Sequence, residues 1–214
     1  MKLHHGHVIT LALLLCCAWA ADAAERVFSP TEILSWQRHS FSGETSYTLI
    51  EKAGRMAVHA SCTNATASGL FLEEEIDLDA TPILEWDWLV EQTFEQINER
   101  TKSGDDYPAR LYAVDRHRFA MWRTVALNYV WASEIPRGES WENAYQGRAK
   151  MVAVRSGSPV SGQWVTERRD LREDFQTHHN RLVSRIHALA VMTDCDDTGK
   201  PIEAWYGEIR LLAK

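Results

Sequence analysis

The sequence predicts an all-β protein, an antiparallel two-sheet sandwich of the jelly-roll type with one or two short helices. Two observations predict this fold class. About ten or eleven short runs alternate between apolar and polar residues and are separated by turn residues. Strands do not alternate with long helical stretches, as they would in a parallel α/β sheet. The roughly 190 residues after an apolar N-terminal segment suit one domain, which we place at residues 24–214.

The predicted elements begin with a short helix, because Ser29 and Pro30 are typical of a helix start. Residues 46–51 and 55–60 alternate around a Lys-Ala-Gly turn, which predicts a hairpin. Residues 171–181 have helical spacing and predict a second helix. Further strands are predicted at residues 68–76, 83–90, 109–114, 124–131, 150–155, 164–170, 186–192 and 204–212.

The strand at residues 83–90 has the clearest two-residue period in the chain. Leu84, Trp86, Trp88 and Val90 share one face of it. Four consecutive apolar positions on one face predict that this face lies in the core.

An acidic turn separates the last two predicted strands, which we interpret as a hairpin with a long loop. Three carboxylates and a hydroxyl lie within it, and Gly199 and Pro201 follow. A D-x-D-x-T pattern is also found in aspartyl-phosphate phosphatases, but here no later strands exist to supply their other catalytic groups. Two interpretations stay open: a turn in which Asp serves only geometry, or a Ca²⁺ site formed by Asp194, Asp196, Asp197 and Thr198.

A second acidic turn precedes Arg110, which the alternating pattern places inside a strand. A buried guanidinium without a partner is unfavourable, so Arg110 should pair with Asp106, Asp170 or Asp194. The alternative is that Arg110 forms a bidentate clamp for a ligand carboxylate, such as that of a uronic acid.

Polar and aromatic residues are interleaved in the predicted central strands, and the whole sequence has nine tryptophans. Asn128 stands among β-branched and aromatic residues, so it must be hydrogen-bonded either to the protein or to a ligand. Flat aromatic rings beside polar groups are typical of sugar sites. The predicted ligand-binding residues are therefore Asp106, Arg110, Tyr112, Asn128 and Trp131. A buried structural network is the alternative for the same residues.

Residues 1–23 have the pattern of a signal peptide, with an apolar run from Val8 to Cys17 followed by small residues. We therefore expect a periplasmic or secreted protein. A lipoprotein anchored at Cys16 or Cys17 is less favoured, because the residue before Cys16 is not small. No later segment is long and apolar enough to span a membrane. The net charge of −7, without a basic stripe, argues against a nucleic-acid partner.

Two cysteines follow the signal peptide, Cys62 and Cys195. In an oxidising compartment such a pair predicts a disulfide. Two separate thiols are the alternative, because sequence alone does not show whether the two Cα atoms are close enough.

An ordered series of motifs resembles a bacterial exported family of unknown function, DUF3047. The motifs lie at residues 86–88, 104–112, 127–131, 154–157, 164–170 and 192–198. The C-terminal half is also similar to galactose-binding-like jelly rolls, in which a late strand pair ends in Tyr-Gly-Asp-Ile. Here the corresponding residues are Tyr206, Gly207, Glu208 and Ile209. The resemblance implies a sandwich fold and carries no activity with it.

The sequence thus favours an exported, non-catalytic sandwich that binds a carbohydrate or another cell-envelope ligand, with Ca²⁺ as the one cofactor considered. A hydrolase or lyase acting on polysaccharide is the first alternative, because it needs two carboxylates or an arginine and a base at one cleft. A structural or interaction protein of the cell envelope is the second.

Overall fold

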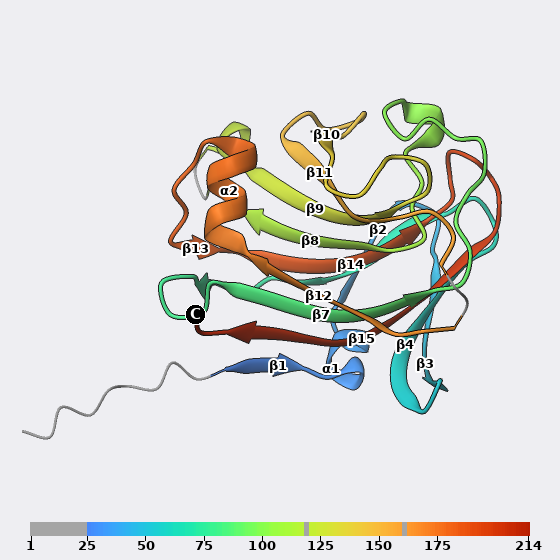
Figure 1. Ribbon diagram of the computed structural model, residues 1–214, viewed down its shortest axis with the longest axis horizontal. Coiled ribbons are helices and arrows are strands. Elements are labelled where there is room, and N and C mark those ends of the chain that lie inside the picture. Colours follow the sequence, from blue (N-terminus) through green and yellow to red (C-terminus); the bar gives the residue numbers. More distant parts are fainter. Residues whose placement is uncertain (1–24, 118–119, 160–161) are drawn as a thin grey trace, which may run out of the picture.

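Two β-sheets packed on each other form the protein in the computed structural model, which describes residues 25–117, 120–159 and 162–214 (Figure 1). The predicted all-β sandwich is confirmed. The predicted signal peptide, residues 1–23, lies outside the described residues. None of the helices in these ranges is long and apolar enough to cross a membrane.

The six-stranded sheet has the order β12-β7-β15-β4-β3, with β1 paired to β15. It contains β1 (Arg26–Phe28), β3 (Ser46–Lys52), β4 (Arg55–Cys62), β7 (Ile83–Val90), β12 (Val165–Asp170) and β15 (Ile202–Leu212). The predicted hairpin is present as β3 and β4, which pair over their whole length.

The seven-stranded sheet has the order β10-β11-β9-β8-β14-β5-β2. It contains β2 (Gln37–Ser42), β5 (Ala67–Leu72), β8 (Arg110–Asp115), β9 (Val125–Ala132), β10 (Ser140–Glu142), β11 (Ala149–Ser156) and β14 (Ala188–Asp194). A separate ladder joins β6 (Ile76–Asp77) to β13 (Arg185–Ile186). One strand pair in the seven-stranded sheet, β9 with β11, is parallel. Sequence analysis predicted only antiparallel pairs and did not predict β10, which pairs with β11 at the sheet edge.

The core lies between the sheets and contains the predicted face of β7: Leu84, Trp86, Trp88 and Val90. The ring of Trp86 lies 5.3 Å from that of Tyr129 in the opposite sheet, centroid to centroid. Trp88 and Trp131 meet in the same way at 5.9 Å. Large aromatic side chains from both sheets therefore supply much of the buried apolar area.

Two short helices close the sandwich, α1 (Pro30–Leu34) and α2 (Leu171–His179). Ser29 caps α1 by accepting from the backbone N–H of Glu32. The Asp170 carboxylate caps α2, so it is not the partner of Arg110. The helix is capped at its C-terminal end by Asn180, which follows His179 and adopts a left-handed conformation with φ of 49°. Figure 1 shows α2 at one end of the strands, where it buries Phe175.

The predicted hairpin of the last two strands is wrong. β14 pairs with β5 and β8 in the seven-stranded sheet, while β15 pairs with β4 and β7 in the other. The acidic turn therefore crosses from one sheet to the other, and its length lets it span the layer of about 10 Å between packed sheets.

A disulfide joins the two sheets at this crossing. Cys62 is the last residue of β4 and Cys195 directly follows β14, and their Cα atoms lie 6.0 Å apart. Both residues are fully buried beside Phe94 and Ile202. The bond fixes the start of the acidic turn against the six-stranded sheet.

Candidate functional site

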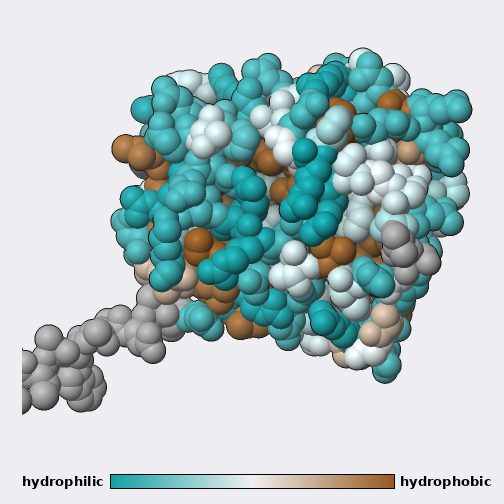
Figure 2. Space-filling model, viewed as in Figure 1, coloured by the Kyte–Doolittle hydropathy of each residue, from teal (hydrophilic) through white to brown (hydrophobic). Residues whose placement is uncertain are grey.

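A hollow of about 450 Å³ lies on the outer face of the seven-stranded sheet. Most of the residues singled out from the sequence line it: Arg110, Tyr112, Asn128, Asp194, Asp196 and Asp197. Figure 2 shows that the surface in this view is largely hydrophilic, with hydrophobic residues scattered over it. The hollow brings most of the predicted site residues together in one place.

The two-residue period of strands explains why these side chains meet. Arg110 and Tyr112 alternate with the core residue Leu111 on β8, so both point away from the core. Asn128 pairs directly with Tyr112 across to β9, and Met192 pairs with Arg110 across to β14. Adjacent strands thus place all four side chains on one surface.

Trp131 does not belong to this surface, which corrects its prediction as a ligand-binding residue. It stands three positions after Asn128 on β9, an odd separation that places it on the opposite face. Its ring packs in the core against Trp88, and its indole N–H donates to the Gly157 carbonyl at 3.0 Å.

Arg110 is the central charged group of the hollow and is only 3% exposed. Its Nη1 donates to an Oδ atom of Asp194, while Nη2 lies 3.5 Å from the Asp105 carboxylate. The guanidinium carbon lies 4.5 Å from the Tyr107 ring centroid and 5.7 Å from that of Tyr112. Burial alone would lower the pKa of Arg110, but the negative charges of Asp194 and Asp105 and the nearby tyrosines together outweigh it, and the pKa is raised. Arg110 is therefore charged, and protein acceptors already contact its terminal nitrogens, so a ligand carboxylate that used both of them would compete with Asp194 and Asp105.

The predicted calcium ligands do not converge as one set. The structure instead brings Asp106, Asp194 and Asp196 together, with one oxygen of each within 4.8 Å of the others. Asp197 accepts from the Tyr145 hydroxyl, and the Thr198 hydroxyl accepts from the backbone N–H of Lys200.

Two of the three clustered carboxylates already have protein donors. Asp106 accepts from the backbone N–H groups of Asp197 and Thr198, at 3.2 and 2.6 Å. Asp194 accepts from the Tyr107 backbone at 3.0 Å as well as from Arg110. Ca²⁺ prefers six to eight oxygen ligands, so this arrangement suits a guanidinium and turn amides better than a calcium ion. Calcium binding stays a prediction.

The carboxylates of Asp196, Asp197 and Asp106 repel one another. Burial raises the pKa of Asp196 above its ordinary value, and the carboxylates of Asp197 and Asp106 raise it further. Burial also raises the pKa of Asp197, although the hydrogen bond from Tyr145 opposes this effect. The hollow therefore carries excess negative charge at neutral pH.

This repulsion predicts a pH-dependent stability. A carboxyl group whose pKa is raised on folding stabilises the fold fully below its unfolded pKa, and this contribution is lost as pH rises through the folded pKa. We expect Asp196→Asn to melt at a higher temperature than the wild type at about pH 7, with the difference shrinking towards about pH 3. Thermal melting across this range measures it. The matched variant Asp79→Asn, at an exposed aspartate outside the hollow, should show no such increase with pH.

Aromatic side chains lead into the hollow across three strands. The Phe71 ring lies 6.2 Å from both Phe41 and Tyr112, and His39 lies 5.4 Å from Phe71. Phe41 is 61% exposed and Tyr145, on the other side of the hollow, is 56% exposed. We call His39, Phe41, Phe71 and Tyr112 the aromatic strip.

Sequence analysis missed most of these aromatic residues. Phe41 and His39 lie on β2, whose six side chains are all exposed and whose sequence is largely polar. Tyr145 and Asn143 lie in a stretch for which no strand was predicted. The alternation of His39 and Phe41 was the local signal on β2, while Tyr112 was among the predicted ligand-binding residues.

Two buried polar atoms of the hollow have no hydrogen-bond partner within the described residues, Asn128 Oδ1 and Arg110 Nε. Asn128 is 1% exposed, and its amide nitrogen donates to the Met151 sulfur at 3.3 Å and lies within hydrogen-bonding reach of the Tyr112 hydroxyl. A buried acceptor without a partner is unfavourable by about 1–3 kcal/mol. A ligand that hydrogen-bonds these atoms would remove that cost.

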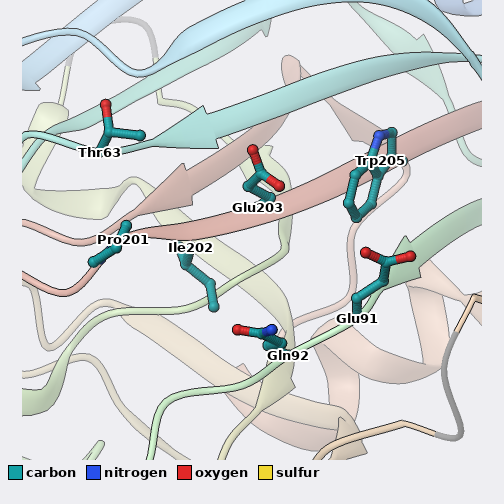
Figure 3. A pocket seen from close by; sticks show the side chains of 7 residues that line it. All are labelled: Thr63, Glu91, Gln92, Pro201, Ile202, Glu203 and Trp205. Atoms are coloured by element: carbon teal, nitrogen blue, oxygen red, sulfur yellow. The ribbon is translucent and has the colours of Figure 1, made fainter.

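A second, smaller hollow of about 220 Å³ lies on the six-stranded sheet (Figure 3). Figure 3 shows Trp205 at one end with Glu91 and Glu203 beside it. His59 stacks on Trp205 at 5.0 Å, and the Lys52 ammonium lies 3.8 Å from the centroid of the same ring. Because protein groups already cover this ring, the hollow lacks an open surface for stacking.

The fold has similar solved structures, all at low identity. The family 11 carbohydrate-binding module of the cellulosomal cellulase Lic26A-Cel5E of Clostridium thermocellum is 11% identical, with a TM-score of 0.49 over 89% of this chain and 95% of that chain. The family 30 carbohydrate-binding module of the cellulosomal cellulase Cel9D-Cel44B of Clostridium thermocellum is 11% identical, with a TM-score of 0.48 over 88% of this chain and 98% of that chain. The catalytic domain of Humicola grisea Cel12A is 12% identical, with a TM-score of 0.41 over 87% of this chain and 92% of that chain. These values carry no information about the ligand of this chain.

The sequence comparison identifies a family but no activity. No curated protein matches the chain. The model of a family described as "Protein of unknown function (DUF3047)" matches residues 34–210. The match spans most of the chain and confirms the resemblance seen in the ordered motifs, so the chain belongs to the DUF3047 family.

Proposed function

We propose that this protein binds a carbohydrate, without catalysing a reaction, in the hollow over the seven-stranded sheet. The observation that carries the proposal is the aromatic strip, which leads to buried polar atoms that have no partner among the described residues. A sugar offers both an apolar C–H face, which packs on aromatic rings, and hydroxyl groups, which satisfy buried donors and acceptors. The volume of about 450 Å³ is within the usual range of ligand sites.

The proposed location is the periplasm or the outside of the cell, where the ligand would be a cell-envelope or extracellular glycan. The signal-peptide pattern of residues 1–23 supports it. A disulfide between Cys62 and Cys195 also supports it, because such bonds persist in oxidising compartments.

Asn128→Leu separates a binding role from a structural one. Within the described residues the buried Oδ1 of Asn128 has no hydrogen-bond partner, so a leucine of similar size, which removes this unsatisfied acceptor, should leave the free energy of unfolding unchanged or raise it. We expect the same change to weaken oligosaccharide binding at least tenfold. Isothermal titration against glucose, mannose, glucosamine, N-acetylglucosamine and uronic-acid oligomers, together with urea unfolding, measures both effects.

Phe41→Ala tests the strip with little risk to the fold, because this ring is largely exposed. Loss of its contact with a sugar should weaken binding about tenfold, equivalent to about 1.4 kcal/mol. Met56→Ala is the matched control, since Met56 is also an exposed apolar residue but lies on β4 in the other sheet. The proposal fails if no oligosaccharide binds, or if Asn128→Leu and Phe41→Ala bind as the wild type does. Shortened oligomers after prolonged incubation would instead indicate a hydrolase or lyase.

A further inference from the structure

We propose that the carbohydrate bound in the hollow is an amino sugar with an unsubstituted amine, and that Asp196 and Asp197 receive its ammonium group. This inference rests on the proposed function above and specifies the ligand class. It concerns the part of the hollow formed by the turn between β14 and β15.

The charge of the hollow is the first argument. Five aspartates, at positions 105, 106, 194, 196 and 197, lie in or directly behind its wall, against the single guanidinium of Arg110. Lys102 is a further cation at the rim, and its Nζ lies 4.9 Å from the Tyr145 ring centroid. Lys150 and Lys200 point elsewhere, to Glu142 and to the Glu95 carbonyl. The wall therefore favours a cationic ligand.

The distribution of donors and acceptors is the second argument. Protein acceptors already occupy most donors of the wall: Asn143 donates to Asp105 at 2.7 and 2.9 Å, and Tyr145 donates to Asp197. The Tyr112 hydroxyl contacts the Met192 sulfur at 3.5 Å. Within the described residues the Asp196 carboxylate accepts no side-chain or backbone donor from another residue. The open positions are thus mainly acceptors.

Asn128 provides an observation independent of the acidic turn. Its Oδ1 is a buried acceptor on β9 without a partner, and Asn128 lines the same hollow as Asp196. A ligand that fills the space between them needs donors at both ends. An amino sugar supplies hydroxyl donors along its ring and an ammonium with three N–H donors at one carbon.

The same geometry argues against acidic sugars. The two terminal nitrogens of Arg110 already contact Asp194 and Asp105, so a ligand carboxylate would compete with these residues for them. A uronate would also meet the carboxylates of Asp196 and Asp197, and like charges in one partly buried site repel each other.

The test compares tetramers of β-1,4-linked glucosamine, N-acetylglucosamine and a uronic acid, titrated into the full chain. At about pH 6 a sugar amine is protonated, because an α-amino group has a pKa of about 7.7. We expect the glucosamine tetramer to bind at least tenfold more tightly than its N-acetylated counterpart, which has lost the charge. This preference should shrink as salt is added, because exposed charges are screened.

Two variants test whether Asp196 and Asp197 cause the preference for the free amine. Asp196→Asn combined with Asp197→Asn should remove the preference for the free amine while both tetramers still bind. Asp79→Asn, outside the hollow, should keep the preference.

The possible failures are distinguishable. If the N-acetylglucosamine tetramer or the uronic-acid tetramer binds as tightly as the glucosamine tetramer, the amino-sugar inference is overturned and carbohydrate binding stands. If no tetramer binds, the inference is overturned as well, and the proposed function fails too when the glucose and mannose oligomers also do not bind. If a linear polyamine binds as tightly as the glucosamine tetramer, the hollow recognises amines without the sugar, and the inference is again overturned.

Discussion

Replacing both Cys62 and Cys195 with alanine is expected to lower the free energy of unfolding by about 5 kcal/mol. The bond closes a loop with a sequence separation of 133 residues, and the entropy that such a cross-link removes from the unfolded chain grows with loop length. A loss of this size is a large fraction of the 5–15 kcal/mol typical of a domain. Urea unfolding of the oxidised wild type and the double variant measures it.

Reduction provides the matched control for this prediction. The wild type in excess reductant should unfold at the same urea concentration as the double variant, because both lack only the cross-link. If the oxidised wild type and the double variant differ by less than about 1 kcal/mol, the bond contributes little to stability and the long-loop argument does not apply.

Arg110→Ala is expected to lower the free energy of unfolding by about 3–5 kcal/mol, because it leaves the buried Asp194 carboxylate without its cation. Chemical unfolding at about pH 7 measures the loss. Burial already raises the pKa of Asp194, and Arg110 opposes this effect. Removing Arg110 should raise that pKa further, so the folded state would bind a proton more tightly than the unfolded state. The destabilisation should therefore shrink as the pH is lowered towards about 4.

The double variant Arg110→Met with Asp194→Asn is the control for lost packing. Asparagine still accepts from the Tyr107 backbone N–H, and methionine fills part of the space between the two tyrosine rings. We expect it to regain most of the lost stability, since a buried pair replaced as a unit is often nearly neutral. If the double variant is less stable than Arg110→Ala alone, the unpaired charge is not the cause.

Much of the fold could be predicted because alternation is a local property. The face formed by Leu84, Trp86, Trp88 and Val90 needs only its own strand to be recognised, and all four residues lie in the core. The pattern contains no information about which sheet a strand joins. This is why β14 and β15, consecutive and both apolar, were predicted to pair although they lie in different sheets.

The candidate site was predicted only in part, and for the same reason. Asp194 was one of three partners considered for Arg110, and the structure selects it across 84 positions of sequence. The burial rule required a partner but could not choose among them. Trp131 was placed with Asn128 because of its chemistry, although their spacing of three residues puts them on opposite faces of β9. The aromatic strip depends on β2 lying beside β5, a pairing that no local pattern predicts.

If the hollow binds the proposed ligand, the position of Cys195 links this binding to the redox state of the chain. The residue stands between Asp194 and Asp196, so the disulfide to Cys62 anchors the segment that presents these carboxylates. Linkage is reciprocal: a ligand that binds the oxidised form more tightly must make the disulfide harder to reduce by the same factor. The reduction potential of the Cys62–Cys195 couple is therefore a second readout of binding at the hollow, and it can be measured without any label on the ligand.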